Sequence, residues 1–337
     1  MKHSGSKMES RKRLVLIAAA AAVVAALVFA VVLVRIRSSR KAPYQIVFIP
    51  KVVDEENDFW KALLEGAQAG AKEYGIELAV EAPDAEDNHA MQSEILRETA
   101  KQRPDAVILA PTSYTQVTEA AREVVQAGIP LILVDSTLDE RLEKSLIATD
   151  NLEAGRRMAE CIKPFLPESP VIGIVAHVQG SSTAMEREQG LREGLAGYED
   201  CIVGTVFTNS DYQQGYDVTM ELLDAHPDIN VLMGLNEYSA VGAARAVQDC
   251  GMSDRITMVG FDSSLEEIGL LESGLFRGIV VQKPFNMGYL SVETAVKVIQ
   301  GETVPAYTDS GSQAVTKSTM YSEENQKLLF LFREGEN

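Results

Sequence analysis

The stretch "ITMVGFDSS", residues Ile256 to Ser264, carries an aspartate at the end of a mostly apolar run. The same ending occurs in "PLILVDST", where Pro130 to Val134 lead into Asp135, and "INVLMGLNE" reaches Asn236 in the same way. Short runs rich in Val and Ile are typical of strands that are covered on both faces. Polar residues at three such ends indicate a shared edge where polar side chains converge.

Runs of this kind alternate with amphipathic stretches along most of the chain. Four runs, "QIVFIP", "IELAVE", "AVILA" and "PLILVD", precede a second set, "VIGIVA", "IVGTVF", "NVLMG", "ITMVG" and "GIVVQ". A stretch such as "DFWKALLEGAQAGAKEYG" has apolar residues at three- and four-residue spacing and ends on Gly75, as helices do. Alternating strands and helices predict parallel sheets with helices on both faces. About nine such units exceed one sheet, so we expect an α/β protein with two doubly wound, Rossmann-like lobes.

Several polar residues lie just past the predicted strands. In open parallel sheets, ligands bind beyond the carboxyl ends of the strands. The residues in such positions are Asp135, Asn236, Asp262 and Gln282, with Asn57 in the loop after the first strand. Each alone could instead cap the next helix. Together they predict a shared polar cleft. Phe59 and Trp60, beside Asn57, either form an aromatic wall or pack in the core.

Charge and cysteine content exclude some classes of protein. The 337 residues carry a net charge of −18, but residues 1–43 hold nine basic residues and one acidic residue, which leaves 22 basic and 48 acidic residues in the rest. So acidic a domain repels nucleic acid, because affinity for DNA depends on neutralising phosphates. The three cysteines, Cys161, Cys201 and Cys250, are too widely spaced for a zinc motif or a disulfide framework.

The N-terminal region contains a long apolar segment. Leu14 to Val34 are 21 residues without a charge, about 30 Å as a helix, and basic residues follow directly. A cleaved signal peptide has a shorter apolar region and a small-residue cleavage site. We therefore expect an uncleaved transmembrane anchor, with a cleaved signal as the alternative. Basic residues are almost equally numerous on the two sides, so the positive-inside rule gives no orientation.

Signatures of catalysis, cofactor binding and metal binding are missing from the sequence. It contains no GxGxxG, Walker or HExxH motif, and "VQGSSTA" has Ala184 where a nucleophile elbow needs glycine. The acids of "DAEDNH", Asp84, Glu86 and Asp87, lack the EF-hand pattern and predict a solvated loop rather than a calcium site. The remaining Asp, Asn, Gln and Arg side chains suit the hydroxyls of a sugar. We expect no enzyme, no cofactor and no metal.

Several motifs, in order between about Tyr44 and Lys317, resemble the periplasmic sugar-binding proteins of the ribose-binding type, which share their fold with the ligand domain of the LacI repressors. They include "ENDFWKALLEGAQAGAKEYG", "IPLILVDS", "GSSTAMEREQGLREGL" and "ITMVGFDSS". The resemblance implies two lobes joined by a three-segment hinge near Asp150, Lys283 and Ser310. The N-terminal lobe would comprise residues 44–149 and 283–310, and the C-terminal lobe residues 150–282 and 311–337, after an anchor and linker at 1–43.

The resemblance also implies which residues bind the ligand. The first lobe would contribute Asn57, Phe59, Trp60 and Asp135, the second lobe Arg187, Asn236 and Asp262, and the hinge region Gln282. The prediction for Arg187 depends on the resemblance alone.

Three positions depart from the ribose-type pattern. Asp58 stands where the pattern has proline, and Ser136 where it has arginine. Ser210 or Asp211 replaces an aromatic residue, with Tyr212 close by. We include Ser136 and Asp211 among the ligand-binding candidates, and the ligand is open between a pentose, a hexose, a polyol and a furanose signal molecule.

The resemblance implies an extracytoplasmic protein that closes over a carbohydrate and delivers it to an ABC importer. The alternative is a tethered receptor that reports the sugar to a sensor histidine kinase, which an uncleaved anchor favours. An enzyme acting on a hydroxylated substrate lacks any supporting motif, and the anchor occupies the place that a repressor's DNA-binding domain would need. The tail "NQKLLFLF" either docks on a lobe as a helix or faces a partner, and we favour docking.

Overall fold

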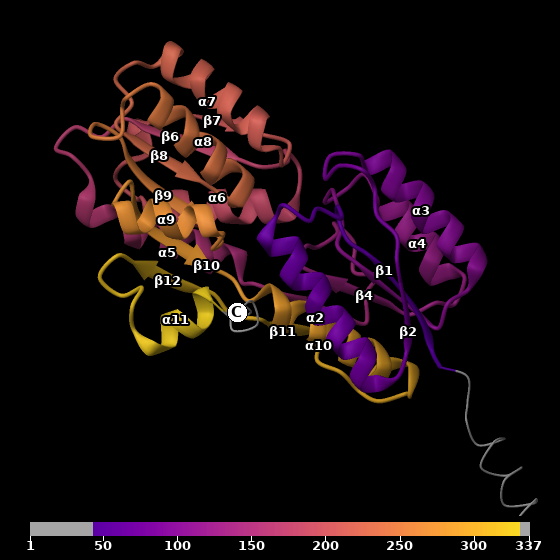
Figure 1. Cartoon of the computed structure of the whole chain (residues 1–337). Helices are drawn as coiled ribbons and strands as arrows, with labels where there is room; N and C mark the ends of the chain where they lie inside the picture. The colour runs from indigo at the N-terminus through magenta and orange to yellow at the C-terminus, as the bar shows by residue number, and fades with distance from the viewer. Residues whose placement is uncertain (1–42, 331–337) are drawn as a thin grey trace, which may run out of the picture. The chain divides into compact units, whose positions relative to one another are not determined.

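A computed structural model describes residues 43–330 of the chain. These residues form two six-stranded sheets with corresponding strand orders, which differ in the direction of the last edge strand. Figure 1 shows the helices that lie around the two sheets. The predicted anchor Leu14–Val34 lies outside the described residues. Among residues 43–330, no helix combines the length and the apolar character needed to cross a membrane.

The first sheet has the order β11-β5-β4-β3-β1-β2, with every pair parallel. Its strands are β1 (Gln45–Ile49), β2 (Glu77–Val80), β3 (Ala106–Leu109), β4 (Leu131–Val134), β5 (Ser145–Ala148) and β11 (Tyr307–Asp309). Its helices are α2 (Asp58–Tyr74), α3 (His89–Gln102), α4 (Thr118–Gln126) and α10 (Pro284–Ile299).

The second sheet has the order β12-β10-β9-β8-β6-β7. Its strands are β6 (Ile172–Ala176), β7 (Ile202–Phe207), β8 (Val231–Gly234), β9 (Thr257–Phe261), β10 (Phe276–Val281) and β12 (Gln313–Thr316). Its helices are α5 (Asn151–Ile162), α6 (Ser182–Gly194), α7 (Tyr212–Ala225), α8 (Glu237–Asp249), α9 (Leu265–Ser273) and α11 (Glu323–Leu329).

Both faces of each sheet are covered, which explains the continuous apolar runs in the sequence. In the first sheet, Ile46 and Phe48 pack toward α2 and α10, whereas Val47 and Ile49 pack toward α3 and α4. Successive side chains of a strand point to opposite faces, so a strand between two helix layers must be apolar at every position. In the second sheet, α5 and α6 cover one face, and α7, α8, α9 and α11 contribute to the core on the other.

Close contact between α2 and α10 depends on glycine. A Cβ atom at Gly288 would lie 1.8 Å from the backbone oxygen of Leu63, and one at Gly66 would lie 2.0 Å from the backbone oxygen of Phe285. The two backbones therefore touch where no side chain separates them. This contact joins two helices of the first lobe that lie far apart in the sequence, α10 and α2 (Figure 1).

Three short strands are additions to the sequence prediction. β5 and β11 extend the first sheet, and β12 pairs antiparallel with β10 at the edge of the second. Their sequences, "SLIA", "YTD" and "QAVT", contain at most three consecutive apolar residues, which is a weak strand signal. The chain passes between the sheets after β5, after β10 and after β11.

The C-terminal helix α11 docks on the second lobe, as we favoured. Leu329 is buried in the core cluster of that lobe, and Gln313 Nε2 on β12 donates a hydrogen bond to Asn325 Oδ1 at 2.6 Å. The three cysteines are free, and only Cys161 is fully buried.

Candidate ligand-binding site

A small cavity, the inner cavity, lies where loops from both sheets meet, and it has a free volume of about 20 Å³. It is lined by side chains that follow strands of the first sheet and of the second. They are Lys51, Asn57, Phe59, Trp60, Glu86, Asp135, His177, Thr183, Arg187, Asn236, Tyr238, Asp262 and Gln282.

Eight of the ten residues predicted to bind ligand line this cavity: Asn57, Phe59, Trp60, Asp135, Arg187, Asn236, Asp262 and Gln282. Ser136 is buried behind them, and its hydroxyl donates a hydrogen bond to Asp135 Oδ2. The structure does not bring Asp211 to the inner cavity. Asp211 is exposed and caps α7, where its Oδ1 accepts from the backbone of Gln214 at 2.7 Å.

The two aspartates occupy equivalent places in the two sheets. The backbone N–H of Asp135, after β4, donates to the carbonyl of Ile147 on β5, and that of Asp262, after β9, donates to Val280 on β10, each at 2.9 Å. Both residues have positive φ, 66° for Asp135 and 91° for Asp262. Such φ values are uncommon for residues other than glycine, and strain of this kind concentrates at functional sites.

Asp135 is held ionised by buried cations. Its carboxylate lies 2.8 Å from Lys51 Nζ, and both side chains are almost fully buried. Burial acts to raise the pKa of Asp135, but the charges of Lys51 and Arg187 outweigh burial and keep this pKa below its usual value.

Asp262 has a different environment. Gln282 Nε2 donates to its Oδ1 at 2.7 Å, and the backbone of Glu237 donates to its Oδ2 at 3.1 Å. Burial raises the pKa of Asp262, and the charge of Arg187 opposes this rise only in part. The oxygen of Gln282 accepts from Thr149, so Gln282 links the end of β10 to the end of β5.

Arg187 is rigidly placed. Its Nε donates to Asn151 and its Nη1 to the carbonyl of Leu235, both at 2.9 Å. Its guanidinium carbon lies 3.8 Å from the centre of the Phe261 ring. Stacking and a planar fork of donors hold an arginine in one orientation better than a lysine. Arg187 is only 3% exposed, so it is not a surface residue, although the charged residues around it in the sequence are typical of an exposed helix start.

Asn57 and Asn236 each do both things that the sequence allowed: they cap a helix, and they line the cavity. Each caps its helix: Asn57 Oδ1 accepts from the backbone of Trp60 and Asn236 Oδ1 from that of Ser239, both at 3.0 Å. Each also lines the inner cavity. Phe59 and Trp60 likewise pack in the core of the first lobe and line the cavity, in an edge-to-face pair with ring centres 5.1 Å apart.

Five lining residues were missed by the sequence analysis: Lys51, Glu86, His177, Thr183 and Tyr238. Lys51 and His177 follow β1 and β6 within two residues, so the rule that singled out Asp135 would have found them. The prediction of a solvated loop for Glu86 is wrong. Glu86 is buried and accepts hydrogen bonds from Trp60 Nε1 at 2.6 Å and from Ser210 at 2.8 Å.

The lobes are in direct contact around the inner cavity. Tyr238 of α8 donates to Asp54 Oδ2 at 2.7 Å, and the Ser210 bond to Glu86 also joins the second lobe to the first. Glu237 of α8 accepts from the backbone of Asp58 and Phe59, at 3.4 Å each, at the start of α2. These bonds define a closed arrangement, in which the aromatic ring of Tyr238 packs against the core of the first lobe.

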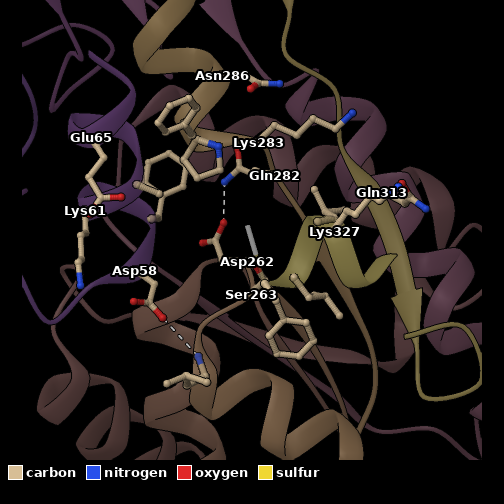
Figure 2. Close-up of a pocket in the computed structure, with 18 of the residues that line it drawn as sticks. Asp58, Lys61, Glu65, Asp262, Ser263, Gln282, Lys283, Asn286, Gln313 and Lys327 are labelled. Atoms are coloured by element: carbon tan, nitrogen blue, oxygen red, sulfur yellow. Dashed lines mark hydrogen bonds between the residues drawn. The ribbon is translucent and has the colours of Figure 1, made fainter. Parts of the chain in front are cut away.

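A larger pocket of about 1100 Å³ adjoins the inner cavity. The two share Phe59, Asp262 and Gln282 as lining residues. Figure 2 shows Asp262 and Gln282 facing each other in this pocket, with Lys61 and Glu65 of α2 across from Gln313 and Lys327. Within residues 43–330, no group of His, Cys, Asp and Glu side chains has an arrangement that could hold a metal ion.

Comparisons with known proteins agree with this architecture. Residues 46–303 match the family model described as "Periplasmic binding protein domain". The "Ribose import binding protein RbsB" of Escherichia coli (strain K12) is 30% identical over 250 residues, which cover 74% of this chain and 83% of that protein.

Solved structures of similar proteins extend the comparison. A sugar transporter from Clostridium phytofermentans is 43% identical, with a TM-score of 0.78 over 81% of this chain and 99% of the other. A carbohydrate transporter solute-binding protein from Agrobacterium radiobacter, in complex with D-arabinose, is 28% identical, with a TM-score of 0.78 over 86% of this chain and 99% of the other.

Members of this group are binding proteins and not enzymes, as we expected of this chain. With its two parallel-sheet lobes and a polar cavity between them, the chain belongs to the periplasmic binding protein family, as a sugar-binding protein of the ribose-binding type.

Proposed function

We propose that this protein binds a neutral pentose, hexose or related polyol between its two lobes outside the cytoplasm and delivers it to an ABC importer. The observation that carries the proposal is the inner cavity, to which both lobes contribute buried donors and acceptors. The names of the relatives add support, because they describe ribose import and a complex with D-arabinose.

The charges of the cavity favour an uncharged ligand. The cations Lys51 and Arg187 face three carboxyl groups, those of Asp135, Asp262 and Glu86. Burial raises the pKa of Glu86 and of Asp262, so neither sign of charge dominates the cavity. Each hydroxyl of a sugar both donates and accepts, which suits a wall of carboxylates, amides and cations. A wrong sugar leaves one of these buried groups unpaired, and that penalty gives selectivity.

Opening of the lobes accompanies binding in this proposal. The free volume of about 20 Å³ is enough for about one water molecule and is far too small for a sugar ring. We propose that the lobes, residues 44–149 with 283–310 and residues 150–282 with 311–337, separate about hinges near Asp150, Lys283 and Ser310. The three passages of the chain between the sheets support this assignment.

The test is a thermal-shift and fluorescence titration of the full chain, kept in solution with a mild detergent, against aldopentoses, aldohexoses, ketohexoses, polyols and amino acids. Trp60 is the only tryptophan in the chain and lines the cavity, so its emission reports binding directly. A ligand at about 100 times its Kd adds about 2.7 kcal/mol of stability.

We expect one sugar or a small set of related sugars to shift both signals, and Asp135→Asn and Asp262→Asn to abolish the shift. A folded sample that responds to none of the sugars and polyols contradicts the proposal. Co-purification of the sugar-loaded chain with a permease then tests delivery.

A further inference from the structure

One buried polar atom in the inner cavity has no hydrogen-bond partner. Among the described residues, the fully buried side-chain atoms without a partner are Ser145 Oγ, Glu267 Oε1 and His177 Nδ1. Of these three residues, only His177 lines the inner cavity. A buried polar atom without a partner costs free energy, so a partner supplied by a ligand would stabilise the bound state.

The other side of the same ring is fixed. His177 Nε2 lies 2.8 Å from Thr183 Oγ1, and Thr183 Oγ1 also accepts a hydrogen bond from Lys51 Nζ at 3.4 Å. Thr183 lies in the first turn of α6, which Ser181 caps. His177 and Thr183 both belong to the second lobe, and Lys51 of the first lobe joins this pair only while the lobes are closed. With Nε2 occupied, Nδ1 is the ring nitrogen left to meet a ligand.

The imidazole is uncharged in this setting. Burial, together with the charges of Arg187 and Lys51, lowers the pKa of His177 well below its usual value. A neutral imidazole has one N–H donor and one nitrogen acceptor. A hydroxyl group can donate and accept, so it can pair with Nδ1 whichever nitrogen carries the proton. A carboxylate or an ammonium group fits only one of the two forms.

We propose that His177 contacts the ligand directly: its Nδ1 forms a hydrogen bond with one hydroxyl group of the sugar, and Thr183 and Lys51 orient the ring for that bond. The inference rests on the proposed function and adds to it a selectivity element that comes from the loop after β6. The ligand then carries a hydroxyl at the ring position that faces His177, and an analogue without that hydroxyl binds weakly.

The experiment uses variants of the full chain that separate the two ring nitrogens. His177→Gln places an amide near the position of Nε2 and keeps the bond to Thr183, but it leaves nothing at Nδ1. His177→Asn places an amide near Nδ1 and gives up the bond to Thr183. Ser145→Ala is the matched control, because Ser145 Oγ is also buried and unpartnered but does not line the cavity.

Each variant is titrated with the panel sugar that gives the largest shift and with every monodeoxy analogue of that sugar. We expect His177→Gln to weaken the parent sugar about tenfold to hundredfold. We also expect His177→Gln to bind one deoxy analogue about as well as the parent sugar. The other deoxy analogues should still bind more weakly than the parent sugar, as they do to the unaltered chain. His177→Asn should retain part of the discrimination against the first of these analogues, and Ser145→Ala should match the unaltered chain.

If a folded His177→Gln protein shows the same loss of affinity for every deoxy analogue, relative to the parent sugar, as the unaltered chain, this inference is overturned and the sugar-binding function stands. An unaltered chain that binds no panel sugar overturns both. If His177→Gln does not fold, Thr183→Val serves in its place. It frees the ring to turn and should reduce discrimination at the same single position, and discrimination equal to that of the unaltered chain overturns the inference.

Discussion

Lys51 Nζ lies 2.8 Å from Asp135 Oδ2, and each side chain is less than 5% exposed. The pair joins the loop after β1 to the residue that follows β4. The ribose-type pattern places an arginine at position 136, where this chain has Ser136. Lys51 therefore brings a cation to Asp135 from a different strand, and the loss of the arginine does not leave the aspartate without a counter-ion.

Removal of that counter-ion should lower the free energy of unfolding. Lys51→Met leaves Asp135 buried with only the charge of Arg187 nearby. Breaking a buried ion pair from one side costs about 3–5 kcal/mol in the free energy of unfolding. Chemical denaturation measures the loss, with Lys101→Met as the control, because the pair of Lys101 with Glu98 is exposed and should contribute less than about 1 kcal/mol. A loss for Lys51→Met as small as that of the control would contradict the prediction.

Stability should fall as the pH rises toward 8. Burial raises the pKa of Glu237 to about 8, with smaller contributions from the charges of Asp262 and Asp58. Between the ordinary pKa of about 4.5 and about 8, the folded protein binds a proton at Glu237 that the unfolded chain has released. The free energy of unfolding therefore decreases with rising pH over this range, by up to about 1.4 kcal/mol per pH unit from this residue.

Denaturation curves from about pH 6.5 to pH 8 give this slope, because below the ordinary histidine pKa of 6.5 the lowered pKa of buried His177 contributes a slope of the opposite sign. Other buried carboxyl groups with raised pKa values, such as Glu86 and Asp262, add a slope of the same sign. Glu237→Gln should flatten the curve measurably without abolishing it. Identical slopes for the variant and the unaltered chain would show that Glu237 titrates at its ordinary pKa.

The bond between Tyr238 and Asp54 should stabilise closure rather than folding. Tyr238→Phe keeps the ring that packs with the core of the first lobe, but it removes the hydroxyl that donates across the lobes at 2.7 Å. A hydrogen bond to a charged acceptor contributes about 1.5–3 kcal/mol, and we expect sugar affinity to fall about tenfold or more.

Tyr321→Phe is the control, because Tyr321 donates to Glu272 within the second lobe. Titration of both variants with the panel sugars distinguishes a loss of closure from a general loss of stability. Small-angle scattering of Tyr238→Phe should show a larger radius of gyration without ligand. Equal affinity in the two variants would exclude a part in closure for the Tyr238 hydroxyl.

Glycine should matter at the contact between α2 and α10. Gly288→Ala places a methyl group where the backbone of Leu63 lies, so the helices must separate. Overpacking of this kind costs about 1–3 kcal/mol. Gly269→Ala, in helix α9 with no atom within 4 Å of the new methyl group, should instead stabilise the protein by about 0.5–1 kcal/mol. Melting curves of the two variants should shift in opposite directions, and a shared direction would contradict the packing argument.

The sequence determined the architecture because the pattern that encodes it is local. Runs such as "IVFI", residues 46–49, are apolar at every position, as a strand covered on both faces requires, and the amphipathic stretches between them supply the cover. The strand-end rule also identified Asp135, Asn236 and Asp262 as residues of one polar site. β5, β11 and β12 escaped prediction, because their sequences, "SLIA", "YTD" and "QAVT", contain at most three consecutive apolar residues.

Only the tertiary structure decided which residues share the inner cavity and in what state. Glu86 lies in a run of acids that indicates a solvated loop. In the structure it is buried, and it accepts hydrogen bonds from Trp60 and Ser210, which are distant in the sequence. Asp211 and Asn236 both cap helices after strands, but only Asn236 reaches the cavity. Burial and the pairing of charges depend on distances between segments far apart in the chain, and those distances are fixed by how the elements pack.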